Sequence, residues 1–404
     1  MDGLLFLTHR IPYPPNKGDK IRSYNLLKYL AKHFQVYLGT FIDDPADRSN
    51  VEPLREYCRE IMAIDLHPNR RKIASLRGLL NGKPLTVPYY ANREMQDWIS
   101  NIVASRGIRN ALVFSSAMAQ FIDVPACEKL KRIIDFVDVD SEKWRAYAHS
   151  KHWPVSRIYA REARKLLAYD TEIAARFDHS LFVSQAEADL FERLSGLGGE
   201  KIGALHNGVD MTYFDPDRRH ENPYDSDRPV LVFTGAMDYW ANGDAVCWFA
   251  NEVFGAIRAA VPGAEFWIVG SRPSPAVQRL QRLEGVHVTG AVADVRPFLR
   301  HAKAAVAPLR LARGIQNKIL EAMAMAKPVI ATPQAIEGID IGGDYESLIT
   351  EKVPDMVDIG CAALISDRYN ALGAVGRAYV ERHHDWTSQL AKIKPLFTQG
   401  ELRT

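Results

Sequence analysis

The sequence predicts an α/β protein of two domains, each built around a doubly wound parallel sheet. Its 404 residues exceed the size at which a single hydrophobic core stops growing. From residue 4 onward, short apolar runs alternate with amphipathic stretches, as strands alternate with helices in a parallel sheet. Between residues 210 and 228 the alternation stops, and the chain becomes polar and rich in Asp, Asn and Pro. We therefore expect the first domain over residues 1–209 and the second from residue 210.

Seven apolar runs in the first half have the length of strands and precede turns or polar segments. These predicted strands are residues 4–8, 36–41, 61–66, 111–115, 132–137, 180–183 and 202–205. Helical periodicity separates them at residues 20–32, 70–80, 92–105, 157–177 and 186–194.

The second half repeats the pattern after the polar stretch. Its predicted strands are residues 230–234, 266–269, 286–289, 304–307 and 329–331, and its predicted helices are residues 243–260, 275–283, 294–301 and 315–326. This alternation predicts a second doubly wound sheet without a detectable sequence repeat.

Composition narrows the class of protein. A formal net charge of +2 excludes nucleic-acid binding as a property of the whole molecule. The four cysteines, at 58, 127, 247 and 361, have no metal-ligand or CxxC spacing. The chain begins without a basic leader region, and no apolar run is long enough to span a bilayer. We expect a cytoplasmic protein with no metal or cofactor, and membrane contact that is at most peripheral.

The segment 310–331 contains the strongest candidate site. Gly314 precedes a predicted helix, whose first backbone N–H groups and dipole favour a bound diphosphate. Lys318 and Glu321 lie three residues apart and share one helix face. The ammonium suits phosphate charge, and the carboxylate suits the two hydroxyls of a ribose. The alternative is an ordinary surface Lys–Glu pair beside a glycine turn.

This segment resembles the signature helix of the group 1, family four retaining glycosyltransferases of the GT-B class. The resemblance lies in Leu-Glu-Ala-Met-Ala at 320–324 and Lys-Pro-Val-Ile-Ala at 327–331. It implies two Rossmann-like domains facing each other across a cleft, a nucleotide-sugar donor, no metal, and retention at the anomeric carbon. It assigns the ribose to Glu321 and places Arg313 where the family has a glutamate near the donor sugar.

Other parts of the chain extend the resemblance. Residues 206–210, 234–238 and 268–270 are similar to family segments in the same order. Residues 385–397 resemble the helix that returns to the first domain, which implies a second domain over 210–384 and a crossing segment over 385–404. The family's basic pair after Gly235 is absent, and Trp240 and Asn242 stand nearby instead. The donor-binding residues implied in this way are Gly18, Gly235, Arg272, Arg310, Gly314, Ile315, Gln316, Lys318 and Glu321.

The first domain is expected to hold the acceptor. Lys17 and Lys20 flank Gly18 in the loop after the first strand, and we assign both to the acceptor side. Carboxylates at 135, 138 and 140 end another strand, where ligands bind in open α/β sheets. Asp138 is the expected catalytic carboxylate, together with Lys318 and Glu321. Alternatively, Asp140 only caps the following helix.

Three motifs are similar to the subgroup associated with bacterial exosortase and exopolysaccharide loci: residues 14–22, 135–141 and 314–318. This similarity implies a glycan acceptor linked to polyprenyl diphosphate at the inner face of the membrane. Two basic amphipathic stretches, 17–32 and 70–83, are candidates for contact with anionic lipid. Each stretch is equally compatible with a helix whose apolar face packs on the sheet.

Other functions remain open at this point. Asp138-Val139-Asp140 is an Asp-x-Asp pattern, as in metal-dependent transferases with a single domain. A nucleotide-sugar epimerase shares the two-domain architecture and needs no acceptor. A degenerate protein that only binds nucleotide-sugar is the third alternative. A dehydrogenase is disfavoured, because no GxGxxG follows a first strand.

Overall fold

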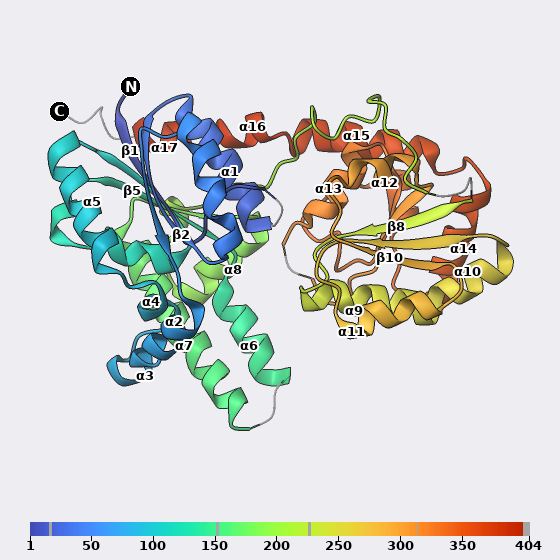
Figure 1. Ribbon diagram of the computed structural model, residues 1–404, viewed down its shortest axis with the longest axis horizontal. Helices are drawn as coiled ribbons and strands as arrows, with labels where there is room; N and C mark the ends of the chain where they lie inside the picture. Colours follow the sequence, from blue (N-terminus) through green and yellow to red (C-terminus); the bar gives the residue numbers. More distant parts are fainter. Residues whose placement is uncertain (16–17, 151–152, 225–227, 313, 399–404) are drawn as a thin grey trace. The chain divides into compact units, whose positions relative to one another are not determined.

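The computed structural model describes residues 1–404 apart from 16–17, 151–152, 225–227, 313 and 399–404 (Figure 1). Contacts divide the chain into two compact units. Unit 1 comprises Met1–His206 and the described residues from Leu390 onward. Unit 2 comprises Asn207–Gln389.

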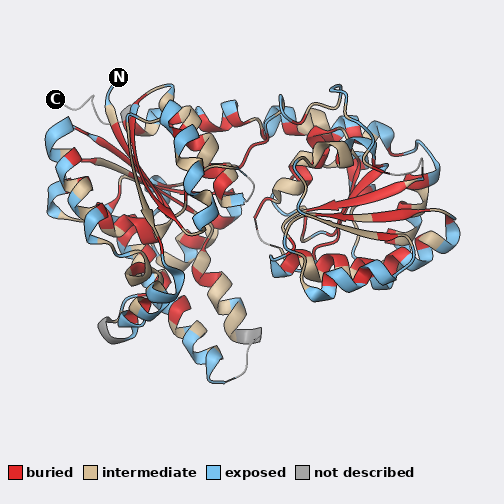
Figure 2. Ribbon diagram, viewed as in Figure 1, coloured by how far each residue is buried: buried red, intermediate tan, exposed pale blue. Residues whose placement is uncertain are grey.

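Unit 1 is built on a parallel sheet, which has seven strands in the described chain, in the order β3-β2-β1-β4-β5-β6-β7. Its central strands are buried on both faces, which explains why they form continuous apolar runs (Figure 2). The strands are β1 (Gly3–Thr8), β2 (Gln35–Ile42), β3 (Glu60–Asp65), β4 (Asn110–Phe114), β5 (Lys131–Val137), β6 (His179–Phe182) and β7 (Ile202–Ala204).

Helices surround this sheet, and one pair extends away from it. The helices are α1 (Gly18–Ala31), α2 (Pro68–Ser75), α3 (Arg77–Asn81), α4 (Thr86–Tyr90), α5 (Arg93–Arg106), α6 (Asp140–Ser150), α7 (Val155–Arg176) and α8 (Gln185–Ser195). Helices α6 and α7 form the extended pair, and α2, α3 and α4 lie along α7 (Figure 1). Phe397 of the C-terminal helix α17 (Lys394–Thr398) packs against Phe34, with ring centroids 5.3 Å apart.

Helix α1 belongs to the core of unit 1. Leu26, Leu27 and Leu30 are fully buried, and so are the cationic side chains of Lys20 and Arg22. Of the two interpretations of residues 17–32, packing on the sheet is therefore the correct one for the described part of this stretch. Its apolar face is not available to a membrane.

Unit 2 contains the second parallel sheet, with five strands in the described residues, ordered β10-β9-β8-β11-β12. The strands are β8 (Val230–Thr234), β9 (Glu265–Val269), β10 (Val286–Gly290), β11 (Ala304–Ala307) and β12 (Val329–Ala331). The helices are α9 (Trp240–Trp248), α10 (Phe254–Ala260), α11 (Pro275–Arg279), α12 (Arg296–His301), α13 (Asn317–Ala324), α14 (Val353–Ile365), α15 (Asn370–His383) and α16 (Trp386–Leu390).

The unit boundaries differ slightly from the predicted domain boundaries. Residues 207–209, assigned from the sequence to the first domain, lie in unit 2, as do residues 385–389. The physical reason is local pairing: the Val209 N–H donates to His384 O at 2.7 Å, and His384 Nδ1 lies 3.1 Å from Asn207 O. These bonds hold the connecting segment against the end of α15.

Candidate functional site

The carboxyl edge of the unit 2 sheet brings three glycines together at the ends of β8, β9 and β10. The Gly235 N–H donates to Val269 O at 3.0 Å, and the Gly270 N–H donates to Gly290 O at 3.2 Å. A Cβ atom at Gly270 would lie 1.7 Å from Gly235 O. Only glycine fits there, so the loop after β8 sits directly against the end of β9.

Lys318 is held against this glycine loop by Asn242. Lys318 Nζ donates to Asn242 Oδ1 at 2.6 Å, and Asn242 Nδ2 donates to Ala236 O at 2.8 Å. A Cβ atom at Gly235 would lie 2.8 Å from Asn242 Nδ2 and 3.2 Å from Lys318 Cε. The loop, helix α9 and helix α13 therefore converge on a single ammonium group.

Burial shifts the pKa of Lys318 and of its neighbour Glu321 in opposite directions. Burial lowers the pKa of Lys318 to about 8, although the Glu321 carboxylate opposes the shift. Burial likewise raises the pKa of Glu321 to about 7, although Lys318 opposes it. Two side chains that both titrate near neutral pH, one turn apart on a helix, are typical of a functional site.

Helix α13 begins beside this pair. Gly314 has a φ of +67°, which forms the turn into the helix and favours glycine. The Gln316 side chain donates to Gly314 O at 3.0 Å and does not cap the helix. The dipole and the first N–H groups of α13 favour an anion at this end. The Ile315 side chain is buried against Gly338, so only its backbone can serve a ligand.

The two arginines predicted for the donor are each paired with a carboxylate. Arg272 lies 3.3 Å from Asp238, and Arg310 Nε donates to Asp244 Oδ2 at 3.0 Å. Both arginines are exposed. Because these carboxylates offset their charge, Lys318 is the better candidate for binding phosphate. Arg313 lies outside the described residues.

Of the two lysines assigned to the acceptor side, the structure describes Lys20 but not Lys17. Lys20 donates to Asp47 at 2.6 Å and is buried, so it stabilises unit 1 and is not free to bind an acceptor. Its assignment to the acceptor side stays a prediction, which this pairing disfavours. Lys17 lies outside the described residues, and Gly18 is exposed at the first position of α1.

The three carboxylates at the end of β5 separate into two roles. Asp135 is fully buried and accepts from Arg22 Nε and Nη2 at 2.8 and 3.0 Å. Lys143 Nζ lies 2.7 Å from Asp138 Oδ2 and 2.9 Å from Asp140 Oδ1. Although burial disfavours the ammonium, Asp140 and Asp138 raise the pKa of Lys143 above its ordinary value. The Lys143 ammonium therefore contacts both carboxylates of the Asp-x-Asp pattern, which were considered above as possible metal ligands.

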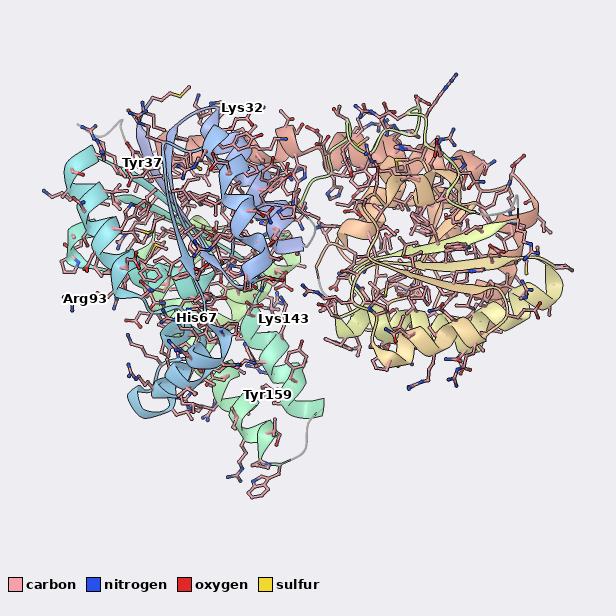
Figure 3. All side chains as sticks on the ribbon, in the orientation of Figure 1. Lys32, Tyr37, His67, Arg93, Lys143 and Tyr159 are labelled. Carbon is pink, nitrogen blue, oxygen red and sulfur yellow. The ribbon has the colours of Figure 1, made fainter. Side chains whose placement is uncertain are left out.

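A cavity of about 260 Å³ lies in unit 1 beside these residues. Its lining combines aromatic rings with polar groups. One of the lining residues is Lys143, which lies on α6 (Figure 3). The lining residues are His9, Thr86, Tyr90, Ser115, Ser116, Ala117, Asp140, Lys143, Trp144, Tyr147 and Leu166. Asp138, predicted to face the acceptor, does not line the cavity and contributes through its contact with Lys143.

In the described chain, buried polar atoms without partners and strained backbone positions occur in or near the cavity lining. Among the described residues, His9 Nδ1 and Thr86 Oγ1 are buried without a hydrogen-bond partner. Ser115 has a φ of +79° at the end of β4, and Val137 has a φ of +71° at the end of β5. Positive φ is rare in non-glycine residues and strained for valine, and such strain gathers at functional sites.

Sequence reasoning missed His9, Trp144 and Tyr147 as site residues. The His9 ring stacks on Phe114 with centroids 5.8 Å apart, at the carboxyl end of β1. The Trp144 ring stacks on that of Tyr159 of α7, with centroids 5.4 Å apart. His9 directly follows the predicted strand 4–8, and a polar residue at the carboxyl end of a buried strand is a candidate for ligand binding in open α/β sheets. That position could have identified His9 from the sequence.

Comparison with known proteins bears on both units. Residues 228–367 match the family model described as "Glycosyl transferases group 1". No curated protein matches the sequence significantly.

The described residues contain no group of His, Cys, Asp and Glu side chains that could hold a metal ion. No helix in the described part of the chain is long and apolar enough to cross a bilayer.

Solved structures resemble the whole chain at low identity. HepE of Anabaena, in complex with UDP and glucose, has a TM-score of 0.68 at 14% identity, covering 98% of this chain and 100% of HepE. Sucrose-phosphate synthase of Thermosynechococcus elongatus has a TM-score of 0.68 at 16% identity, covering 99% of each chain. WaaG, a glycosyltransferase involved in lipopolysaccharide biosynthesis, has a TM-score of 0.64 at 16% identity, covering 98% of this chain and 100% of WaaG. The chain therefore has the α/β fold of the GT-B glycosyltransferases, and its second unit matches the group 1 glycosyltransferase family.

Proposed function

We propose that this protein is a metal-independent glycosyltransferase that moves a sugar from a nucleotide-sugar to a glycan acceptor, with retention of the anomeric configuration. The observation that carries the proposal is the position of the Lys318 side chain. Its ammonium group is held by Asn242 beside the Gly235 loop, and Glu321 lies one helical turn away. All four residues lie within the segment that matches the group 1 family.

Unit 2 supplies the donor site. The diphosphate binds between the Gly235 loop and the start of α13, where Lys318 and backbone N–H groups offset its charge. Glu321 accepts from the ribose hydroxyls. Because HepE is described with UDP, glucose and UDP-glucose, UDP-glucose is the first donor to test.

Unit 1 supplies the acceptor site in the cavity beside β1, β4 and α6. Trp144 and Tyr147 offer apolar ring faces, against which the C–H face of a sugar packs. His9 and Thr86 also line this cavity, and their imidazole and hydroxyl groups are candidate hydrogen-bond partners for sugar hydroxyls. Asp138 and Asp140 keep Lys143 charged at the rim.

The chemistry consists of one substitution at the anomeric carbon. The bond from that carbon to the diphosphate oxygen breaks, and the oxygen keeps the electron pair. The acceptor oxygen forms the new bond on the same face, and its proton passes to the departing diphosphate. Lys318 and the dipole of α13 stabilise the charge that develops on the leaving group.

The acceptor proposed here is a glycan linked to polyprenyl diphosphate, used in bacterial exopolysaccharide assembly at the inner face of the cell membrane. The support is the similarity of residues 14–22, 135–141 and 314–318 to the exosortase-associated subgroup. We accordingly place the protein in the cytoplasm, in peripheral contact with that membrane.

The first test is a donor screen with purified protein. Thermal unfolding and nucleotide release are measured with UDP-, GDP-, ADP- and TDP-sugars, with and without EDTA. We expect one donor to raise the unfolding temperature regardless of EDTA and to release nucleotide slowly. In Glu321→Gln, kcat/KM for that donor should fall about 10- to 100-fold, because a charged hydrogen-bond acceptor is lost.

Other outcomes of the screen contradict the proposal. Stabilisation without nucleotide release or transfer would indicate a protein that only binds nucleotide-sugar. Conversion of the donor to another nucleotide-sugar would indicate an epimerase. Stabilisation only with a divalent cation would exclude the metal-independent mechanism.

The acceptor cavity gives a second prediction. In Trp144→Ala, the KM for a glycan acceptor should rise about tenfold, because the variant removes an aromatic contact face. Stabilisation by the donor should not change. Leu283→Ala, at an exposed apolar residue of unit 2, is the control. An unchanged acceptor KM in Trp144→Ala would exclude the cavity as the acceptor site.

A further inference from the structure

One end of unit 1 exposes large apolar side chains from two separate segments. Ile73 of α2, Leu76 between the two helices and Leu79 of α3 are 71%, 53% and 43% exposed. At the start of α7, Val155 and Ile158 are exposed, and the preceding Trp153 is 75% exposed. We call these six residues the apolar end of unit 1.

Hydrogen bonds fix the two segments beside each other. Arg161 Nη2 donates to Gly78 O at 2.6 Å, and Glu162 Oε2 accepts from the Leu85 N–H at 2.6 Å. Arg161 is one turn beyond Ile158, so the first turns of α7 lie next to α3 (Figure 1). The apolar end is therefore a feature of one region of the fold.

The exposed charged side chains near the apolar end are positive. From residue 67 to residue 90 the chain has no Asp or Glu, and Arg70, Lys72 and Arg77 are exposed there. On α7, Arg157, Arg164 and Lys165 are exposed, while the nearby acid, Glu162, is buried against Arg161 and Leu85. Exposed apolar side chains are thus surrounded by cations.

We propose that the apolar end of unit 1 docks onto the surface of an anionic lipid bilayer. The cations attract the negatively charged lipid headgroups, and the aliphatic side chains insert among the headgroups at the bilayer surface. The Trp153 indole suits the same interfacial depth, where tryptophan is enriched. A second copy of the chain is a poorer occupant, because it would oppose cations to cations. This inference rests on the proposed function, and it names the surface that brings the enzyme to a lipid-linked acceptor.

The test is co-sedimentation of the full chain with phosphatidylcholine vesicles, with and without phosphatidylglycerol. We expect binding to the mixed vesicles. The triple variant Arg70→Gln/Lys72→Gln/Arg77→Gln should bind roughly 100-fold more weakly, at a factor of about five per cation. The triple variant Ile73→Ser/Leu76→Ser/Leu79→Ser should bind more than about tenfold more weakly.

Matched variants in unit 2 serve as controls. Arg279→Gln/Arg282→Gln/Lys303→Gln and Leu283→Ser/Ile365→Ser/Val375→Ser change exposed residues of the same kinds. Both should bind vesicles like the parent protein. Equal losses in the control and test variants would overturn the proposal, because they would show a nonspecific effect of charge or hydrophobicity.

The outcome separates this inference from the proposed function. If the parent protein transfers sugar to a water-soluble acceptor but ignores vesicles, only the docking surface is refuted. A concentration-dependent dimer that the serine variant abolishes, without vesicle binding, would assign the surface to a second copy and also overturn it. If no donor binds but vesicle binding depends on these residues, the proposed function fails and the surface stands.

Discussion

In Lys318→Met, turnover with the best donor should fall by about 100- to 1,000-fold. The variant removes the cation that stabilises charge on the departing diphosphate, and removal of one such electrostatic contact has effects of this size. The thermal stability of the variant should match or exceed that of the parent. The reason is that burial lowers the pKa of Lys318, so the folded protein disfavours its charge. Initial rates and thermal unfolding of the same samples provide the measurement.

The pH dependence of kcat/KM extends this prediction. Below pH 7, Glu321 gains a proton and loses its role as acceptor, because its pKa is raised to about 7. Above pH 8, Lys318 loses its charge, because its pKa is lowered to about 8. The free enzyme should therefore give a bell-shaped profile with its maximum between these values. In Lys318→Arg the alkaline limb should disappear, since arginine stays protonated. A flat parent profile, or more than about a third of the turnover in Lys318→Met, would contradict the assignment.

The second large effect is on stability. Asp135→Ala should lower the free energy of unfolding by about 3–5 kcal/mol, because it leaves the buried Arg22 guanidinium without its carboxylate. Arg22 also donates to Leu205 O at 2.7 Å, so this pair ties helix α1 to β5 and to the end of β7. Urea unfolding followed by circular dichroism and tryptophan fluorescence measures the loss.

Two controls separate the buried charge from a general effect of substitution. Glu52→Ala removes one partner of an exposed pair, Arg55–Glu52, and should cost less than about 1 kcal/mol. The double variant Arg22→Met/Asp135→Leu should recover much of the stability, because an apolar pair replaces both charges. A small loss in Asp135→Ala would show that the guanidinium finds other partners.

The sequence predicted the strands far better than the C-terminal helices. Every strand of both sheets coincides with a predicted apolar run to within about two residues. Strands buried on both faces must be apolar throughout, so their signal is local and strong. No helix is predicted from the sequence at α14 or α15. In α15, Gly373 and Gly376 weaken the helical pattern, but both allow close packing: a Cβ atom at Gly373 would lie 2.1 Å from Ala326 O.

In the candidate site, too, the local features could be predicted from the sequence and the long-range contacts could not. The spacing of Lys318 and Glu321 on one helix face is a local property, so the sequence by itself identified the pair. The partner of Lys318 is Asn242, 76 residues away, and the partner of Arg22 is Asp135, 113 residues away. No local pattern specifies such pairs, because long-range packing brings them together.

The two basic amphipathic stretches show most directly where local sequence stops being informative. Both residues 17–32 and residues 70–83 combine cations with an apolar stripe. In the structure, Leu26, Leu27 and Leu30 are fully buried, whereas Ile73, Leu76 and Leu79 are exposed. The sequence determined the two sheets and which residues share a helix face. Only the tertiary structure decided which face is covered, because burial depends on the elements that pack against it.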